Sequence, residues 1–296
     1  MTSRYKTPDA ARRAVTDRLR ADAAKGSWPL PDLQRQYAYD QLVERLYRTD
    51  GGWVIKGATA LLARRVSVRH TIDIDVYLAG AIDDVERRLR DAAVLDIGDW
   101  VRFEVGSSTR IRAAGAQASR VRIQSFIGTK LWTAFQVDIV ADGIQMSGEP
   151  ELVPSLTSIN TVEQERALWR AYPLVDHVAD KVCAIVERHD GRPSTRFKDL
   201  IDLVAIADRA VVAAEPQMVA LSKEGRRREL HLPAAFDVPD RALWTSGYRA
   251  EARRTTGLSA LELDHALTAV RPLLDPLLDG TAAGVWHPAR HAWLPG

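Results

Sequence analysis

Apolar residues recur with two different periods along the chain, and the change of period divides it. In the first half, runs in which every second residue is apolar predict β-strands, and runs with apolar residues three or four positions apart predict helices. We expect strands over 53–57, 71–79, 100–105, 119–127 and 131–141, and helices over 8–24, 31–48, 58–65 and 82–95. The strand signals stop after residue 141.

From about residue 160 the period is helical throughout. Helices are expected over 158–172, 173–190, 196–210 and 259–280. The segment 146–158 is rich in proline, glycine and serine and predicts a linker. The pattern predicts an α+β, bilobed protein: a mixed sheet with flanking helices in an N-terminal domain, 1–150, and a helical C-terminal domain, 151–296.

Composition narrows the class of protein. Of the 296 residues, 46% are hydrophobic and 27% charged, which is typical of a globular protein. A net charge of +2 excludes a general polycation, so nucleic-acid binding would need local basic patches. The single cysteine, Cys183, excludes an internal disulfide and favours a reducing compartment. The N-terminus has no apolar signal segment, and no stretch approaches the roughly 20 apolar residues of a membrane span. We therefore expect a cytoplasmic protein that does not enter a membrane.

One expected strand carries two like charges on one face. In "RHTIDIDV" (69–76), Thr71, Asp73 and Asp75 share a face and the isoleucines take the other. Adjacent carboxylates repel, and a hard divalent cation such as Mg²⁺ removes the conflict. A solvated strand face is the other interpretation of this short motif.

Two further features favour the metal interpretation. In "FQVDIV" (135–140), Asp138 points away from its apolar neighbours and could join Asp73 and Asp75 from an adjacent strand. Three carboxylates suit two-metal phosphoryl transfer. Upstream, Gly57 lies where a strand turns into a helix, a place where backbone N–H groups bind phosphate, although an ordinary tight turn would look the same.

This order of motifs resembles the DNA polymerase β-like nucleotidyltransferase superfamily. Within it, "KGATALLARRVSVRHTIDIDVYL" and "DKVCAIVERHDGRPSTRFKDLIDLVAI" (180–206) resemble the AbiEii/AbiGii-type, MenT-like nucleotidyltransferase toxins, and the resemblance runs from about 50 to 206. Ala58 departs from the pattern, since the family usually has a second glycine, serine or threonine there. Thr59 or the backbone would then make the phosphate contact.

The resemblance implies a role for each matched residue. Asp73, Asp75 and Asp138 would hold Mg²⁺ or Mn²⁺, with Asp138 also acting as the base. Lys181 would contact the triphosphate of the nucleotide. The expected catalytic set is Asp73, Asp75, Asp138, Lys181, Asp199 and Asp202. The expected nucleotide-binding set is Lys56, Gly57, Ala58, Thr59, Arg69 and Lys181.

Simpler interpretations of the helical block remain open at this point. Lys181 could be a solvated helix lysine. Asp199 and Asp202, one helical turn apart, could pair with Arg196 or Lys198.

The family also implies an activity and partners. Its members are toxins of toxin–antitoxin systems, NTP-dependent enzymes of the EC 2.7.7 type that add nucleotides to the 3′ acceptor end of tRNA and block translation. The helical domain would close the active-site cleft, an antitoxin would restrain the enzyme, and we expect a monomer. Candidate RNA contacts are Arg64, Arg65, Arg226, Arg227 and Arg228. The run 226–228 taken alone favours a solvated helix face, whereas Arg64 and Arg65 lie beside the expected site and favour phosphate contacts. Trp244 and Tyr248 could stack on a base or belong to the core.

Other functions share parts of this pattern. A small-molecule (antibiotic-type) nucleotidyltransferase would have the same carboxylate strand, and a protein nucleotidyltransferase would differ only in its acceptor. A catalytically dead binding module is a further alternative, against which the intact Asp73, Asp75 and Asp138 argue. A glycosyltransferase D-x-D motif would not explain Gly57, Asp138 and the 180–206 block together.

Thr71 leads to a hypothesis about regulation. A phosphoryl group on Thr71 would add nearly two negative charges beside the carboxylates and could take the place of the triphosphate. We hypothesise that phosphorylation of Thr71, for instance by an antitoxin acting as a kinase, switches the activity off. The alternative is an ordinary β-branched strand residue.

Overall fold

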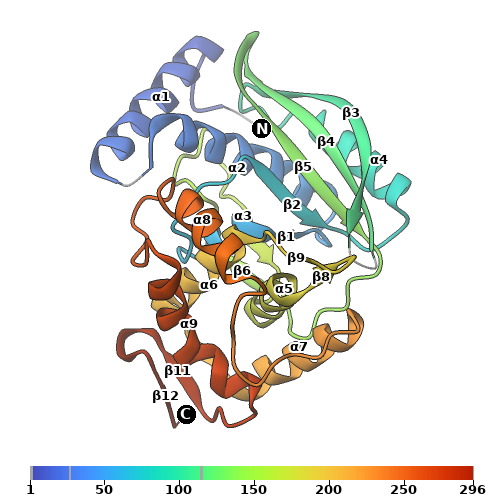
Figure 1. Ribbon diagram of the computed structural model, residues 1–296. Coiled ribbons are helices and arrows are strands. Elements are labelled where there is room, and N and C mark those ends of the chain that lie inside the picture. The colour runs from blue at the N-terminus through green and yellow to red at the C-terminus, as the bar shows by residue number, and fades with distance from the viewer. Residues whose placement is uncertain (1–2, 27, 114–115, 296) are drawn as a thin grey trace. The chain divides into compact units, whose positions relative to one another are not determined.

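The computed structural model describes residues 3–26, 28–113 and 116–295. The chain divides into two compact units (Figure 1). Unit 1 comprises Met1–Arg64, His70–Ile144 and Pro150–Ala171, and unit 2 comprises Arg65–Arg69, Gln145–Glu149 and Tyr172–Gly296. Unit 1 combines helices with a mixed sheet and unit 2 is mainly helical, which confirms the predicted α+β class. The cleft-closing role of the helical part stays a prediction.

Unit 1 contains the predicted strands and helices of the first half of the chain, but the strand expected over 100–105 continues to Ala113, and the described residues include two further short strands. Its elements are α1 (Pro8–Lys25), α2 (Leu30–Thr49), β1 (Val54–Lys56), α3 (Gly57–Ala63), β2 (Asp73–Tyr77), α4 (Ile82–Ala93), β3 (Val101–Ala113), β4 (Ala116–Ile127), β5 (Lys130–Ala141), β6 (Glu151–Val153) and β7 (Trp169–Ala171).

In the described part of unit 1 the strands form a seven-stranded sheet in the order β3-β4-β5-β2-β1-β7-β6. Strands β2 and β5 are parallel, as are β1 and β7, and the other neighbouring pairs are antiparallel. The long strands β3, β4 and β5 run side by side (Figure 1). The parallel β2–β5 pair brings the two aspartate-bearing strands together.

The core of unit 1 lies on one face of this sheet. Along β4, Val121 and Ile123 are buried, whereas Arg122 and Gln124 between and beside them are exposed. Apolar side chains of α1, α2 and α4 join the buried face in one core, and the ring of Tyr39 in α2 meets that of Phe135 edge-on at 5.0 Å. Each large apolar side chain buried in this way contributes about 1.5–3 kcal/mol. The alternation leaves a polar face on the other side of β3–β5.

Two predictions for the segment after β5 are wrong. Strands do not stop at residue 141, because β6 and β7 complete the sheet, and the helix expected over 158–172 does not form. The buried carboxylate of Asp40 accepts hydrogen bonds from the backbone N–H groups of Leu156 at 2.7 Å and Thr157 at 2.9 Å. Trp169–Ala171 pairs with strands on both sides. Tertiary hydrogen bonds from α2 and β1 thus override the local helical spacing.

Unit 2 contains further helices, and its described short strands form a three-stranded sheet, β10-β11-β12, and a two-stranded sheet, β8-β9. Its elements are α5 (Leu174–Val186), β8 (Arg188–His189), β9 (Arg192–Pro193), α6 (Phe197–Arg209), β10 (Val212–Ala213), α7 (Ala214–Arg227), α8 (Arg241–Ala252), α9 (Leu263–Leu278), β11 (Val285–His287), the 3₁₀ helix η1 (Pro288–Arg290) and β12 (Ala292–Leu294). The helices α7 and α8 lie outside those predicted from the sequence.

Two aromatic residues of α8 form part of the core of unit 2. Trp244 is fully buried, meets Phe197 edge-on at 5.0 Å and donates a hydrogen bond from its indole nitrogen to the Ser194 carbonyl at 2.8 Å. Tyr248 is also fully buried, and its hydroxyl donates to the Ala260 carbonyl. The core interpretation is therefore confirmed, and stacking of these rings on a base is wrong.

None of the described helices has both the length and the apolar character needed to cross a membrane.

Candidate functional site

A row of four charged residues crosses the sheet of unit 1. The register pairs Lys56 on β1 with Asp75 on β2, Asp75 with Asp138 on β5, and Asp138 with Arg120 on β4. Residues that pair across neighbouring strands lie on the same face, so the two carboxylates lie side by side between two cationic side chains. The structure thus brings Asp138 next to the Asp-x-Asp strand.

Arg120 holds Asp138 in a fixed orientation. Its Nε and Nη2 atoms donate to Asp138 Oδ1 and Oδ2 at 2.7 and 2.6 Å, a bidentate pair. The hydrogen bonds to Asp138 raise the pKa of Arg120. Sequence reasoning missed Arg120, although the alternation in "SRVRIQSFI" places it on the polar face of its strand.

Asp73 lies two residues before Asp75 on β2, and residues from three segments surround it. The hydroxyl of Thr71 donates to the Asp73 carboxylate, and the buried hydroxyl of Thr59 donates to the Asp73 carbonyl at 3.3 Å. The hydroxyl of Tyr39 donates to the Thr71 carbonyl at 3.2 Å, and burial raises the pKa of Tyr39, which keeps it a neutral donor. Because Thr59 ties α3 to β2, the backbone is favoured over its hydroxyl for a phosphate contact.

The turn from β1 into α3 approaches Asp75 closely. Gly57 has a φ of +56°, and a Cβ built on it would lie 1.8 Å from Asp75 Oδ2. Only glycine fits this position, because any side chain would collide with the carboxylate and strain the backbone. Lys56 precedes this turn, and Ala58 is buried directly after it.

The three carboxylates can be tested as ligands of a divalent cation. Among the residues that the structure describes, no three histidine, cysteine, aspartate or glutamate side chains converge in an arrangement that could hold a metal ion. Asp138 faces Arg120, and Asp73 faces Thr71. The donor chemistry nevertheless fits, because Asp73, Asp75 and Asp138 supply only hard oxygen ligands from neighbouring strands. Their role as metal ligands stays a prediction.

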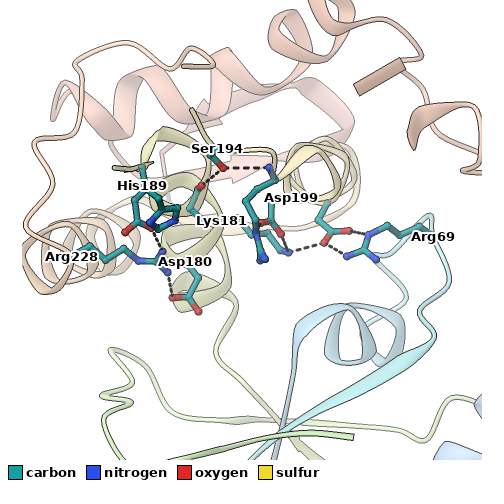
Figure 2. Close-up of polar contacts among 11 residues, drawn as sticks. Arg69, Asp180, Lys181, His189, Ser194, Asp199 and Arg228 are labelled. Carbon is teal, nitrogen blue, oxygen red and sulfur yellow. Dashed lines mark hydrogen bonds and ion pairs between the residues drawn. The ribbon is translucent and has the colours of Figure 1, made fainter. Parts of the chain in front are cut away.

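A second cluster of predicted residues lies wholly within unit 2 (Figure 2). The Lys181 ammonium group donates to Asp199 at 3.0 Å and to Asp202 at 2.6 Å. Arg69 donates to both oxygens of Asp202 at 2.8 Å, and Arg196 donates to Asp199 at 2.6 Å. The solvated interpretation of Lys181 is wrong, because the lysine is buried in the centre of this network.

The charges of this cluster depend on one another. Burial acts to lower the pKa of Lys181, but the carboxylates of Asp199 and Asp202 outweigh it and raise that pKa above its usual value. Burial likewise acts to raise the pKa of Asp202, but Arg69 and Lys181 outweigh it, and the pKa falls well below its usual range. Lys181 is therefore a permanent cation and Asp202 a permanent anion at neutral pH.

The arginines predicted to contact RNA have contacts within their own units. Arg64 pairs with Glu151 at 2.9 Å. Arg228 pairs with Glu224, Glu187 and Asp180, and Arg227 also pairs with Glu224. The Arg226 guanidinium donates to the hydroxyl of Ser222. Arg65 is exposed and has a φ of 61°. These ion pairs fit a structural role for the Arg227–Arg228 run, whose RNA contact stays a prediction.

A family model described as "Nucleotidyl transferase AbiEii toxin, Type IV TA system" matches residues 42–269, which is more than half of the chain. The chain belongs to this family. The AbiEii-type chain is thus a nucleotidyltransferase of the type IV toxin–antitoxin class, as its motifs predict.

Two solved structures share the fold of this AbiEii-type chain. JHP933 from Helicobacter pylori is 16% identical, with a TM-score of 0.51 over 84% of this chain and 92% of that protein. MenT4, a nucleotidyltransferase toxin from Mycobacterium tuberculosis, is 17% identical, with a TM-score of 0.51 over 90% of this chain and 98% of MenT4. A comparison with curated proteins finds no match.

Proposed function

We propose that this AbiEii-type enzyme transfers nucleotides from an NTP to the 3′ acceptor end of tRNA, with Mg²⁺ or Mn²⁺, and so blocks translation. The observation that carries the proposal is the pairing of Asp75 with Asp138 across β2 and β5, with Gly57 directly against Asp75. Family membership supports the transfer reaction. The tRNA acceptor follows from the resemblance to MenT-like toxins.

The proposed step is an in-line displacement at the α-phosphorus of the NTP. The 3′-hydroxyl oxygen of the acceptor forms a bond to this phosphorus, the bond to the bridging oxygen breaks, and pyrophosphate leaves. Asp138 accepts the hydroxyl proton, with its carboxylate oriented by Arg120. Asp73, Asp75 and Asp138 would hold the divalent cation, which supplies neutralisation of the phosphate charge. Lys181 as a triphosphate contact stays a prediction from the resemblance.

The experiment that tests this function supplies each labelled NTP with Mg²⁺, total tRNA, a metabolite extract and total protein in one reaction. Label on tRNA supports the proposal. Label only on small metabolites or only on a protein would support the small-molecule or protein alternative, and no transfer with any NTP would contradict all three.

The matched variants are Asp75→Asn and Asp17→Asn. The first removes a charge beside Asp138 and is expected to abolish transfer. The second removes an equal charge from an exposed position on α1 and is expected to leave transfer unchanged. Full activity of Asp75→Asn would exclude the carboxylate row, the row of charged residues that contains Asp75 and Asp138, as the site of the reaction.

The wider setting follows from the toxin class. We propose that the enzyme acts on tRNA in the cytoplasm as a monomer, and that a cognate antitoxin restrains it. Light scattering of the purified protein tests the monomer. Phosphorylation of Thr71 is proposed as one way in which the activity could be switched off, since its hydroxyl contacts the Asp73 carboxylate.

A further inference from the structure

The polar face of β3–β5 continues the carboxylate site across the sheet. Gln136 on β5 pairs with Asp73 on one side and with Arg122 on β4 on the other. Neighbouring strands lie about 4.8 Å apart, so Arg122 is roughly 10 Å from Asp73 at the backbone. Because side chains at paired positions share a face, Arg122 points to the same side of the sheet as the carboxylates.

Arg122 differs from the other charged residues near the site. It is exposed, and among the described residues its guanidinium group has no hydrogen bond or ion pair. Arg120, two residues away on the same face, donates from Nε and Nη2 to Asp138. An exposed guanidinium without a protein partner, next to a phosphoryl-transfer site, is suited to bind a phosphate.

Further along the same face of β4 lies a stacked pair. Phe126 pairs with Arg102 on β3, and the guanidinium carbon of Arg102 lies 4.0 Å from the centre of the Phe126 ring. Gln124 is exposed between Phe126 and Arg122. The neighbouring Glu104 accepts a hydrogen bond from Arg102, so the surface carries two arginines and one carboxylate. Arginine–aromatic stacks and exposed amides on a sheet are a chemistry that binds splayed bases of single-stranded RNA.

The position of this face relative to the site indicates which substrate it would bind. The strand order β4-β5-β2-β1 places Asp138 and Asp75 in the middle, the Gly57 turn at the end of β1 on one side, and Arg122 with Phe126 on β4 on the other side. The Gly57 turn is the proposed phosphate contact of the NTP, and Asp138 is the proposed base for the acceptor hydroxyl. An acceptor that reaches Asp138 from the side away from Gly57 would therefore cross β4.

We propose that Arg122, Gln124 and the Arg102–Phe126 stack form a binding platform for the single-stranded 3′ end of the RNA acceptor. This inference rests on the proposed function and deepens it. Arg122 contacts a backbone phosphate, and a base stacks on the half-exposed guanidinium of Arg102, which lies over the Phe126 ring. The uncompensated charge of Arg122 complements the polyanion, and the platform is continuous with the carboxylate row.

The test measures KM for tRNA and for NTP separately in Arg122→Glu, Phe126→Ala and one control, and the salt dependence of tRNA binding in Arg122→Gln. Arg122→Glu and Phe126→Ala are each expected to raise KM for tRNA roughly tenfold and to leave KM for NTP unchanged. Arg122→Gln removes about one phosphate contact. It is therefore expected to reduce the slope of log K for tRNA binding against log salt concentration by about 1. The control is Arg18→Glu. Arg18 is an exposed residue of α1, and α1 packs on the other face of the sheet.

The outcomes separate this inference from the proposed function. Circular dichroism and thermal unfolding first establish that each variant is folded. If the native enzyme labels no RNA, the proposed function fails. If the native enzyme labels tRNA while Arg122→Glu and Phe126→Ala keep the native KM for tRNA, the platform is excluded. Native RNA binding in these variants, combined with lost binding of a protein inhibitor, would likewise overturn the RNA platform and assign the face to a protein.

Discussion

Gly57 and Asp75 approach each other so closely that a Cβ on Gly57 would lie 1.8 Å from the Asp75 Oδ2 atom. The two residues come from different elements, the turn after β1 and the middle of β2. This contact fixes the carboxylate against the turn and makes the backbone of residue 57 part of the site.

Substitution Gly57→Ala is therefore expected to displace Asp75. The strained backbone should cost about 1–3 kcal/mol of stability, while a shift of the carboxylate by about 1 Å should lower kcat roughly hundredfold. Steady-state transfer kinetics and thermal unfolding measure the two effects. The control is Gly51→Ala, where an added Cβ meets no atom within 4 Å. Equal activity of the two variants would contradict the importance of the contact.

Arg120 offers a second test of the carboxylate row. Arg120→Lys keeps the charge but loses the bidentate geometry on Asp138, and kcat should fall roughly tenfold with KM for NTP unchanged. The matched control is Arg110→Lys on β3, where the arginine pairs with Glu86 of α4. A loss of stability without a change in kcat would show that Arg120 only supports the fold.

Strand alternation predicted the faces of Asp73, Asp75 and Asp138 but not their register. The β4–β5 hairpin begins with Ile127 opposite Lys130, and a shift between Ser125 and Phe126 then moves the pairing by one residue. Without this bulge Asp138 would face Ser119 instead of Arg120. A one-residue insertion of this kind leaves no signal in the apolar pattern, so the Arg120–Asp138 pair could not be foreseen.

The pattern of apolar and polar positions does not predict the long-range ion pairs either. Helical spacing placed Asp199 and Asp202 on one face of α6, but Arg69, the partner of Asp202, lies 133 positions earlier in the chain. The strand β7 was missed because its pairing with β1 depends on contacts that the local spacing does not encode. Secondary structure is thus predictable where the apolar period is strong, whereas the pairing of segments far apart in the chain is not.

The Thr71 hypothesis leads to a prediction that separates charge from size. Thr71 is 8% exposed and its hydroxyl contacts the Asp73 carboxylate. Thr71→Glu places a negative charge there and should abolish nucleotide transfer, whereas the uncharged Thr71→Gln, of similar size, should retain part of it. Transfer assays on the two folded variants make the comparison. Full transferase activity of Thr71→Glu would exclude the switch.

The buried Lys181 cluster predicts a pH dependence of stability. The pKa of Asp202 is depressed in the fold, chiefly because Arg69 and Lys181 outweigh the effect of burial. A carboxylate whose pKa is depressed in the fold contributes stability at pH values above its unfolded pKa of about 4. That contribution is lost as the pH falls towards the folded pKa. The native protein should therefore lose stability steeply below about pH 4.

Asp202→Asn removes the contribution of Asp202 to the pH dependence of stability. It also removes the negative partner of the buried ion pairs with Arg69 and Lys181. At pH 7 it should cost about 3–5 kcal/mol, because Arg69 and Lys181 lose a buried counter-charge. Between pH 4 and pH 2 its melting temperature should fall less than that of the native protein, since one titrating carboxylate is gone. The control is Asp17→Asn on α1, whose exposed carboxylate should leave the profile unchanged. Parallel profiles for native protein and Asp202→Asn would show that the Asp202 charge does not stabilise the fold.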